Sequence, residues 1–368
     1  MKAIAVVPQS GNARLVDREE PSISSATEVK LQVIRVGICG TDREEFGGGR
    51  SKAPDGAAEL VIGHEMMGRV VETGRGVKRV QPGDYAVFTV RRGCGECTSC
   101  AMLRPDMCRT GKYKERGIWG LDGYQAEYVV DDEHWIVRVP EELAGVGVLV
   151  EPLSVVEKAI DESVRVQFAR LPSAPAKPAW LHGRRCLVAG LGPIGLLAAL
   201  VLRLRGAEVF GLDKVDENSA RPQWLEHIGG RYVNGSQVPV DRIDESLGEM
   251  DLIVEAAGVA GLAFNLLDAL APNGICVLTG VPGEGRPIEI PGAELVRGLV
   301  LGNQLLFGSV NAAPDHFQMG VDDLYTAHLR WSGHAERLIT HRHNYADFEA
   351  AFGRHPDDEI KSVIEWAG

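Results

Sequence analysis

The sequence lacks any long, unbroken apolar run. Its longest uncharged and mostly apolar stretch, LVAGLGPIGLLAALVL at residues 187–202, contains three glycines and a proline. This stretch is shorter than the roughly 18 residues expected of a membrane span. The apolar run at the N-terminus, KAIAVV, is too short for a signal peptide. These absences predict a cytoplasmic protein with no membrane partner.

An excess of positive charge is also lacking, because the formal net charge is −12. Proteins that bind nucleic acid usually carry a basic surface, so we expect no nucleic-acid partner. The apolar content of 45% and the charged content of 24% are typical of a soluble globular protein. With 368 residues and no internal repeat, the chain is long enough for two domains.

The pattern of apolar residues changes along the chain. Up to about residue 155, short β-branched runs such as KLQVIRVGI and GYQAEYVV predict strands of an antiparallel domain. From about 180 to 305, apolar runs such as CLVAG and DLIVEAAG alternate with helical segments, which predicts a parallel α/β sheet. The stretch at 169–185 contains three prolines and indicates a surface connection. The tail is expected to hold helices and a final strand, IKSVIEWA.

A dinucleotide fingerprint lies at the start of the second zone. The apolar run CLVA leads into Gly190, Gly192 and Gly195 in the spacing G-x-G-x-x-G, and a helical pattern follows. Such a turn lets a pyrophosphate approach the backbone at the N-terminus of a helix. Asp213 ends the next strand, about 20 residues downstream, where an acidic residue binds the ribose hydroxyls. Asp213 therefore favours NAD, although Lys214 directly after it leaves NADP possible.

Four of the seven cysteines lie close together, in the spacing C-x2-C-x2-C-x7-C. In a cytoplasmic protein such a cluster indicates a metal site rather than disulfides. Four thiolates complete the tetrahedral shell of a structural zinc and leave no position for a substrate. An iron–sulfur cluster is the alternative, but the bacterial ferredoxin spacing has a shorter last gap followed by proline. The predicted ligands of the structural zinc are Cys94, Cys97, Cys100 and Cys108.

A second possible metal site is dispersed over Cys39, His64, Glu65 and Glu151, each beside a glycine or proline at an expected loop edge. Taken singly, the cysteine or the histidine could be a packed core residue, and either carboxylate could be exposed. Taken together, a thiol, an imidazole and a carboxylate form a three-ligand zinc site with an open fourth position. An open zinc can lower the pKa of a bound hydroxyl.

These motifs occur in the same order in zinc-dependent medium-chain alcohol dehydrogenases, which the sequence resembles over essentially its whole length. The shared motifs are GICGTD at 37–42, GHE at 63–65, the four-cysteine segment, and GLGPIG at 190–195. More specific stretches resemble the glucose 1-dehydrogenase branch first known from archaea. They are MKAIAV, FTVRR at 88–92, KERGIWG at 114–120, VEPLSVVEKAI at 150–160, ALAPNG at 269–274 and FGSVNA at 307–312.

The resemblance implies an α/β fold of two domains with the active site in the cleft. A GroES-like β-barrel catalytic domain is expected from residues 1–155 and 305–368, with a zinc lobe at 91–111. A Rossmann domain with a doubly wound parallel sheet is expected from 156–304. The resemblance also implies one catalytic and one structural Zn²⁺ in each subunit, and a homodimer or homotetramer.

By the same match, Cys39, His64 and Glu65 would bind the catalytic zinc. Glu151 corresponds to a Glu or Gln of relatives that binds metal, water or sugar. The positions that contact sugar in relatives are Thr41, Glu115, Glu151 and Asn303, and Thr41 is also a candidate proton-relay hydroxyl. The expected cofactor-binding residues are Gly190, Gly192, Pro193, Ile194, Gly195, Asp213 and Lys214, together with Gly280, Val281, Leu301 and Asn303, which match segments that line the nicotinamide in relatives.

The activity implied is zinc-dependent oxidation of an aldose, D-glucose at C1 giving gluconolactone, with hydride transfer to NAD or NADP. The same chemistry on another aldose, a polyol or a simple alcohol is one alternative, and a non-catalytic relative is another. Two departures from the family pattern bear on this. Many relatives have histidine where this chain has Gly302, and relatives that prefer NADP lack an acid at the position of Asp213.

Overall fold

The computed structural model describes residues 1–171, 179–239, 242–283, 287–353, 356 and 358–367. The chain forms two compact units. Unit 1 comprises Met1–Ser154 and Asn311–Gly368, and unit 2 comprises Val155–Val310. The proline-rich part of the predicted surface connection, residues 172–178, lies outside the described residues.

Unit 1 is built on mainly antiparallel strands in three sheets. Its largest sheet has the strand order β11-β6-β5-β3-β19-β18, with β10 also paired to β3. The strands of this sheet are β3 (Glu28–Ile38), β5 (Glu65–Thr73), β6 (Tyr85–Phe88), β10 (Tyr128–Asp132), β11 (Ile136–Val139), β18 (Ile339–Asn344) and β19 (Lys361–Glu365). One of the two smaller sheets contains β1 (Lys2–Val7), β2 (Asn12–Asp17) and β4 (Leu60–Val61). The other contains β7 (Arg91–Arg92), β8 (Lys114–Arg116) and β9 (Gly120–Leu121).

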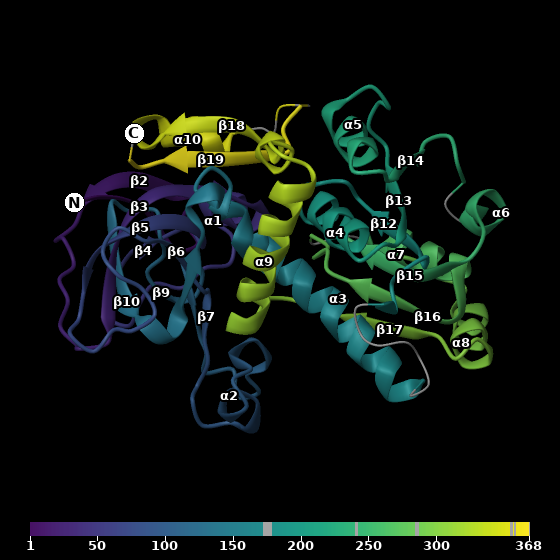
Figure 1. Ribbon diagram of the computed structural model, residues 1–368, viewed down its shortest axis with the longest axis horizontal. Coiled ribbons are helices and arrows are strands. Elements are labelled where there is room, and N and C mark those ends of the chain that lie inside the picture. Colours follow the sequence, from purple (N-terminus) through teal and green to yellow (C-terminus); the bar gives the residue numbers. More distant parts are fainter. Residues whose placement is uncertain (172–178, 240–241, 284–286, 354–355, 357, 368) are drawn as a thin grey trace. The chain divides into compact units, whose positions relative to one another are not determined.

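The central strand of the largest sheet is β3, and its sequence EVKLQVIRVGI explains its place. Leu31, Val33 and Val36 are fully buried, and β-branched residues suit a strand that is covered by neighbours. Strand β19 pairs with β3 so that Ser362 lies opposite Ile38. Figure 1 shows the C-terminal strands β18 and β19 beside these N-terminal strands. The last part of the chain therefore completes a sheet that the first part begins.

Among the described residues, four α-helices belong wholly to unit 1. The longest, α9, buries Phe317, Val321 and Leu324, a spacing of three and four residues that lines one helical face. The segment that carries α2 stands out from the rest of unit 1 in Figure 1. The bounds are α1 (Gly40–Phe46), α2 (Thr98–Ala101), α9 (Pro314–Arg330) and α10 (Phe348–Phe352).

Helix α3 (Val150–Arg170) begins in unit 1 and continues into unit 2. Glu151, which the sequence placed at a loop edge, lies in the first turn of this helix. Pro152 follows it, and proline is tolerated there because the first backbone N–H groups of a helix have no partner within the helix. Glu151 therefore lies where helix α3 begins, one residue after its first residue, Val150.

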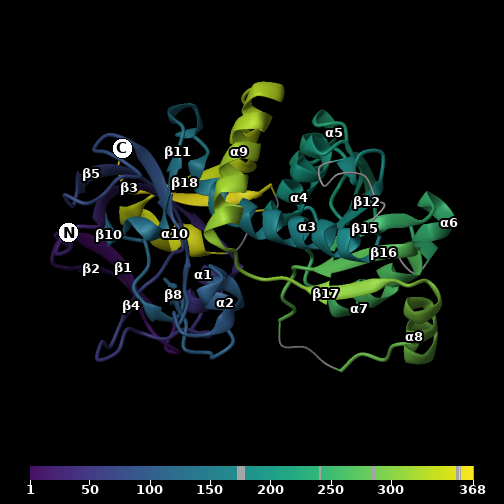
Figure 2. The ribbon, with the colours of Figure 1, turned by 60° about the horizontal axis from the view of Figure 1, so that its bottom comes forward.

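Unit 2 contains one parallel sheet of six strands in the order β14-β13-β12-β15-β16-β17. Figure 1 shows α5 beside β14 at one edge of this sheet, and Figure 2 shows the strands from a second direction. The strands are β12 (Arg185–Ala189), β13 (Glu208–Asp213), β14 (Arg231–Asn234), β15 (Met250–Glu255), β16 (Leu270–Leu278) and β17 (Leu305–Gly308). The helices are α4 (Pro193–Leu204), α5 (Ala220–His227), α6 (Ile243–Leu247), α7 (Ala260–Asn265) and α8 (Gly292–Leu301).

The central strands of unit 2 are apolar in their middle parts because helices cover both faces of a parallel sheet. Leu187, Phe210 and Ile253 belong to its buried core. The edge strand β17 pairs with β16, so residues 305–308 lie in unit 2 rather than beyond it. Among the described residues, no helix is long and apolar enough to cross a membrane.

Candidate functional site

The dispersed site is centred on Cys39 and His64 in unit 1. Cys39 follows β3 and precedes α1, and His64 directly precedes β5. The Cys39 Sγ and His64 Nε2 atoms lie 3.2 Å apart. Ligand atoms of Cys39, His64 and Glu65 all lie within 4.8 Å of one another. A thiol, an imidazole and a carboxylate are the donors that zinc takes in catalytic sites, so these residues fit the metal that the sequence predicts.

Asp42 links the two central residues of this site. Its Oδ2 accepts a hydrogen bond of 2.9 Å from the Cys39 backbone N–H, and its Oδ1 lies 3.6 Å from His64 Nδ1. Burial and the negative charge of Asp42 raise the pKa of Cys39 to about 11. Burial opposes a charge on His64, but Cys39 and Asp42 outweigh it and raise the His64 pKa well above its usual value. The site is therefore arranged to hold a positive charge, and a bound cation would favour the thiolate.

Glu65 has a buried cationic partner of its own. Lys361 on β19 donates a 2.6 Å hydrogen bond to Glu65 Oε1 and a 2.9 Å bond to the carbonyl of Ile38. Each of the two charged side chains is 2% exposed. Burial alone would lower the pKa of Lys361, but the charges of Glu65 and Cys39 raise it above its usual value. Glu65 is thus held by a fixed ammonium group while it lies beside the thiol and the imidazole.

Glu151 lies outside the group of three donors whose atoms meet within 4.8 Å, as far as the described residues show. It is nevertheless close enough to His64 and Glu65 to interact electrostatically. Burial raises the pKa of Glu151 to about 7, with His64 lowering it and Glu65 raising it further. A carboxyl group with that pKa can gain or lose a proton near neutral pH.

The four clustered cysteines of unit 1 form a compact thiol group around α2. The Sγ atoms of Cys94 and Cys100 lie 3.9 Å apart, and those of Cys97 and Cys100 lie 3.5 Å apart. The Cys108 sulfur belongs to the same group, and all four thiols are free. A tetrahedral zinc with Zn–S bonds of about 2.3 Å places its sulfur ligands about 3.8 Å apart. The four side chains therefore fit a zinc site with no position left open.

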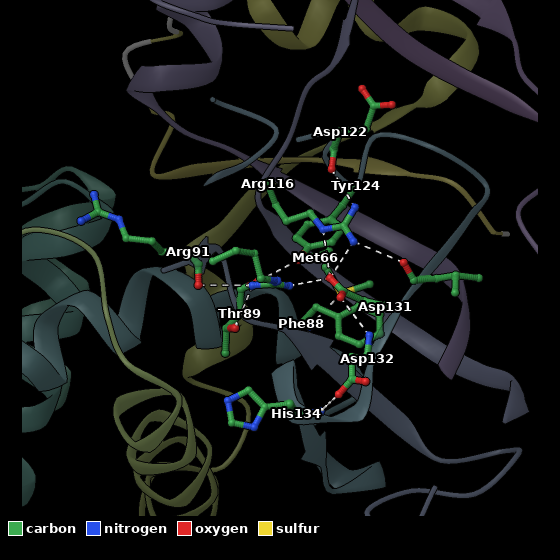
Figure 3. A network of polar contacts seen from close by, with 12 residues as sticks. Met66, Phe88, Thr89, Arg91, Arg116, Asp122, Tyr124, Asp131, Asp132 and His134 are labelled. Atoms are coloured by element: carbon green, nitrogen blue, oxygen red, sulfur yellow. Dashed lines mark hydrogen bonds and ion pairs between the residues drawn. The ribbon is translucent and has the colours of Figure 1, made fainter. Parts of the chain in front are cut away.

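A buried ion network anchors the strands that flank this thiol group. The carboxylate of Asp131 on β10 pairs at 2.6 Å with Arg92 on β7 and at 2.6 Å with Arg116 on β8. Figure 3 shows Asp131 beside Arg116 and Tyr124, whose hydroxyl donates to the carbonyl of Thr89 at 2.8 Å. Burial alone would raise the pKa of Asp131, but the two arginines hold it below its usual value. One carboxylate thus ties β7 and β8, the strands on either side of the thiol group in the chain, to the main sheet.

The predicted dinucleotide fingerprint lies where β12 ends and α4 begins in unit 2. Gly190 has a positive φ of 91°, and a Cβ there would lie 2.7 Å from the Ala257 backbone nitrogen. A Cβ at Gly195 would lie 1.8 Å from the Gly190 carbonyl oxygen. Gly192 caps α4, and Pro193 and Ile194 form the first turn. The turn therefore presents the N-terminus of α4 to a phosphate group.

Asp213 lies at the carboxyl end of β13, beside this turn. Its two carboxylate oxygens accept hydrogen bonds from the backbone N–H of Leu191 at 2.8 Å and of Lys214 at 2.6 Å. A cavity of about 380 Å³ includes Gly190, Asp213, Lys214 and Ala257 in its wall. Gly280 and Val281 follow β16, at the same end of the sheet. These positions match the rule that ligands of open α/β sheets bind outside the carboxyl ends of the strands.

Comparisons with known proteins identify the family. The family model "Glucose dehydrogenase C-terminus" matches residues 144–366, and "Alcohol dehydrogenase GroES-like domain" matches residues 25–141. The chain is 40% identical over 366 residues to glucose 1-dehydrogenase 2 of Vulcanisaeta moutnovskia, with 99% of each chain covered. It is 41% identical over 368 residues to glucose 1-dehydrogenase 1 of Caldivirga maquilingensis, again with 99% of each covered. The chain belongs to the glucose 1-dehydrogenase family.

A solved structure of this family agrees with that assignment. Haloferax mediterranei glucose dehydrogenase in complex with NADP, Zn and gluconolactone matches with a TM-score of 0.88 and 32% identity, covering 100% of both chains. The resemblance to zinc-dependent medium-chain dehydrogenases and the GroES-like plus Rossmann fold predicted from the sequence are both confirmed.

The residues expected to bind sugar in this family fall into two places. Glu115 on β8 is buried, and its Oε1 accepts hydrogen bonds from Arg91 at 2.8 Å and from the Asn311 amide at 2.7 Å. Thr41 lies in the first turn of α1, two residues after Cys39. These side chains and Glu151 all belong to unit 1.

Leu301 and Asn303 lie elsewhere. They precede β17, and the Gly302 carbonyl accepts a 2.7 Å hydrogen bond from the backbone N–H of Asn273, which lies in β16 before Ile275, the partner of Leu305. That is the amino end of these strands, opposite the end that carries Gly190 and Asp213. The structure therefore contradicts the prediction that Leu301 and Asn303 line the cofactor and that Asn303 contacts sugar. For the same reason, the presence of Gly302 where many relatives have histidine gives no information about the substrate.

Two residues near the site were missed by the sequence interpretation. Asn311 lies after the carboxyl end of β17 and donates to Glu115, and the stretch FGSVNA could have directed attention to it. Lys361 pairs with Glu65 across most of the length of the chain, and no local pattern marks it as a site residue.

Proposed function

We propose that this protein is an NAD(P)-dependent, zinc-dependent glucose 1-dehydrogenase. It oxidises an aldose, D-glucose in the first place, at C1 to the lactone and transfers hydride to the nicotinamide of NAD or NADP. The observation that carries the proposal is the 3.2 Å approach of Cys39 Sγ to His64 Nε2 in a buried site flanked by carboxylates. The membership of the chain in the glucose 1-dehydrogenase family supports the choice of substrate.

In this proposal Cys39, His64 and Glu65 hold the catalytic zinc, with Glu151 as a further ligand or as the partner of a bound hydroxyl. Zinc supplies Lewis acidity that lowers the pKa of the sugar hydroxyl, and the nicotinamide accepts the hydride. Glu151 has a pKa of about 7, so its carboxylate can take up the proton that the hydroxyl releases. Thr41 remains a candidate relay hydroxyl for that proton.

The sugar is proposed to be held by carboxylate and amide groups of unit 1. Arg91 and Asn311 fix Glu115 so that its remaining oxygen can accept from a sugar hydroxyl. Charged acceptors of this kind suit a polyhydroxylated substrate, because an analogue lacking the hydroxyl leaves them without a partner. This arrangement favours an aldose over a simple alcohol.

Unit 2 is proposed to bind the cofactor and unit 1 to carry out catalysis. The cofactor-binding residues in this proposal are Gly190, Gly192, Pro193, Ile194, Gly195, Asp213, Lys214, Gly280 and Val281. The carboxylate of Asp213 would accept the ribose hydroxyls of NAD and repel the 2′-phosphate of NADP. NAD is therefore the proposed preferred cofactor, with NADP also accepted.

The proposal also includes a cytoplasmic location and a homo-oligomer. The two thiol-containing metal sites require reduced cysteines, which supports the cytoplasm. Val296, Val300 and Leu301 of α8, the helix that precedes the edge strand β17, are exposed. Exposed apolar side chains on one helix and an edge strand with unpaired backbone groups support association into a homodimer or homotetramer.

The decisive experiment is a substrate panel of aldoses, polyols and simple alcohols with NAD and NADP, followed by absorbance at 340 nm. We expect the largest kcat/KM with D-glucose and a lower value with NADP than with NAD. Metal analysis should give about two zinc ions per chain. A larger kcat/KM for a simple alcohol than for every aldose would contradict the proposal, and a strong NADP preference would contradict the role given to Asp213.

A further inference from the structure

We propose that Glu255 positions the loops that bind the nicotinamide end of the cofactor, and that its negative charge favours the oxidised form of that cofactor. This inference rests on the proposed function, because it requires a pyridine nucleotide at the carboxyl ends of the unit 2 strands. Glu255 is the last residue of β15 and is 2% exposed.

The side chain of Glu255 fixes the loop that follows its own strand. Its Oε1 accepts hydrogen bonds from two successive backbone N–H groups, those of Ala257 at 2.9 Å and Gly258 at 2.8 Å. Ala257 also lies in the wall of the cavity that contains Asp213. A movement of the carboxylate would therefore shift a wall of the cofactor site.

The backbone of Glu255 holds the next loop as well. Its carbonyl accepts hydrogen bonds from the Thr279 N–H at 2.9 Å and the Gly280 N–H at 3.1 Å. The Thr279 hydroxyl donates to the same carbonyl at 2.8 Å. One residue thus joins the loop after β15 to the loop after β16, which carries Gly280 and Val281.

The loops around Glu255 are closely packed against one another. A Cβ on Gly280 would lie 2.2 Å from the Gly258 nitrogen and 2.8 Å from Glu255 Oε2. A Cβ on Gly190, in the dinucleotide fingerprint, would lie 2.7 Å from the Ala257 nitrogen. The carboxylate of Glu255 therefore lies against the backbone at the junction of three loops that end strands β12, β15 and β16.

The charge of Glu255 has consequences for the redox state of the cofactor. In the part of the chain that the structure describes, the carboxylate is bonded by backbone N–H groups and forms no ion pair with a lysine, arginine or histidine. The nicotinamide ring carries a positive charge when oxidised and none when reduced. An uncompensated buried carboxylate behind Gly280 therefore attracts the oxidised ring and leaves the reduced ring unaffected.

Two substitutions in the full-length protein separate the charge of Glu255 from its geometry. Glu255→Gln keeps an oxygen that can accept from Ala257 and Gly258 but removes the charge. Glu255→Asp keeps the charge but withdraws the carboxylate from both N–H groups. The Kd values of NAD⁺ and NADH are measured by fluorescence titration without sugar. Glu208→Gln is the matched control. Glu208 is the first residue of β13, at the end of the sheet away from the cofactor site, and its side chain is partly exposed.

We expect Glu255→Gln to raise the Kd of NAD⁺ on the order of tenfold more than the Kd of NADH. Glu255→Asp should raise both values by the same factor, and Glu208→Gln should change neither. Equal changes for NAD⁺ and NADH in Glu255→Gln would overturn the role of the charge. If Glu255→Gln does not fold, Glu255→Asp decides: equal weakening supports the positioning role, and unaltered binding overturns it.

The same titrations separate this inference from the proposed function. A wild-type protein that binds neither NAD⁺ nor NADH, and neither NADP⁺ nor NADPH, would overturn both. A wild-type protein that binds them while the Kd ratio of Glu255→Gln stays unchanged would overturn only the inference about Glu255.

Discussion

Lys361 and Glu65 form a buried ion pair between the last strand of unit 1 and the strand that begins beside His64. The pair lies within the sheet that holds the candidate catalytic ligands, since β3 pairs with both β5 and β19. The pair therefore contributes both to the stability of this sheet and to the position of Glu65, a predicted ligand of the catalytic zinc.

Replacing Lys361 with methionine should lower the free energy of unfolding by about 3–5 kcal/mol, because it leaves Glu65 buried without its cation. Urea denaturation of the metal-free protein measures this change, because a zinc ion bound to Glu65 would supply another positive charge. Lys2→Met is the control, since it removes the same charge from an exposed pair with Asp17. A Lys361→Met protein as stable as the control would show that the pair contributes little.

The two groups of metal ligands should respond to mutation in opposite ways. Cys39→Ser should abolish dehydrogenase activity and remove one zinc per chain while the thermal unfolding midpoint changes little. Cys97→Ser should remove the other zinc and lower the midpoint, because a structural zinc contributes folding free energy. Metal analysis and calorimetry on both variants test this. A Cys39→Ser protein that keeps full activity would refute the assignment of the catalytic site.

Replacement of Asn311 should lower kcat/KM for the sugar and leave the KM for NAD unchanged. Asn311→Ala removes the amide that donates to Glu115, and the loss of a hydrogen bond to a charged group costs about 1.5–3 kcal/mol. We expect kcat/KM for the sugar to fall on the order of tenfold or more, with the KM for NAD unchanged. Steady-state kinetics measure both values. The control is Asn12→Ala, which changes an asparagine on the exposed strand β2. An equal change in both KM values would indicate a general structural defect.

Glu45 should make stability depend on pH. It is 1% exposed, and burial together with Asp42 raises its pKa to about 9. Because the folded state holds this proton more tightly than the unfolded state, its contribution to stability is complete below about pH 4.5 and is lost as pH rises to about 9. Glu45→Gln should therefore gain stability relative to wild type by up to about 1.4 kcal/mol per pH unit across that window.

Urea denaturation at pH 5, 7 and 9 measures the effect of Glu45→Gln. Glu44→Gln removes the same charge from an exposed position on the same helix and reports the effect of net charge alone. A stability difference between Glu45→Gln and wild type that stays constant from pH 5 to 9 would contradict the prediction.

The features that lie where the sequence placed them are local ones. The glycine fingerprint and Asp213 follow apolar strands whose ends are visible in the sequence, and the four clustered cysteines lie within one short segment. The fold followed from the same strand and helix patterns together with the family motifs. Their physical basis is spacing along the chain, which needs no knowledge of tertiary structure.

The errors arose where position depends on pairing between distant segments. The run LVLGNQLLFGSV, residues 299–310, looks like one apolar strand, but α8 ends at Leu301 and β17 begins at Leu305. Asn303 therefore precedes the strand, and Asn311 follows it. Which end of a strand faces the cofactor is fixed by the parallel register with β16, and that register cannot be read from the run itself. The pairing of Lys361 with Glu65 is equally invisible without the sheet.

The return of the chain to unit 1 after unit 2 sets an order for folding during synthesis. Strands β3 and β5 leave the ribosome early, but β18 and β19, which complete their sheet, are made last. Unit 2 is continuous in sequence, so it can fold while the first part of unit 1 still waits for its partner strands. Glu65 therefore stays without Lys361 until β19 has been made, and we expect the nascent chain to acquire its catalytic metal only after β19 has paired with β3.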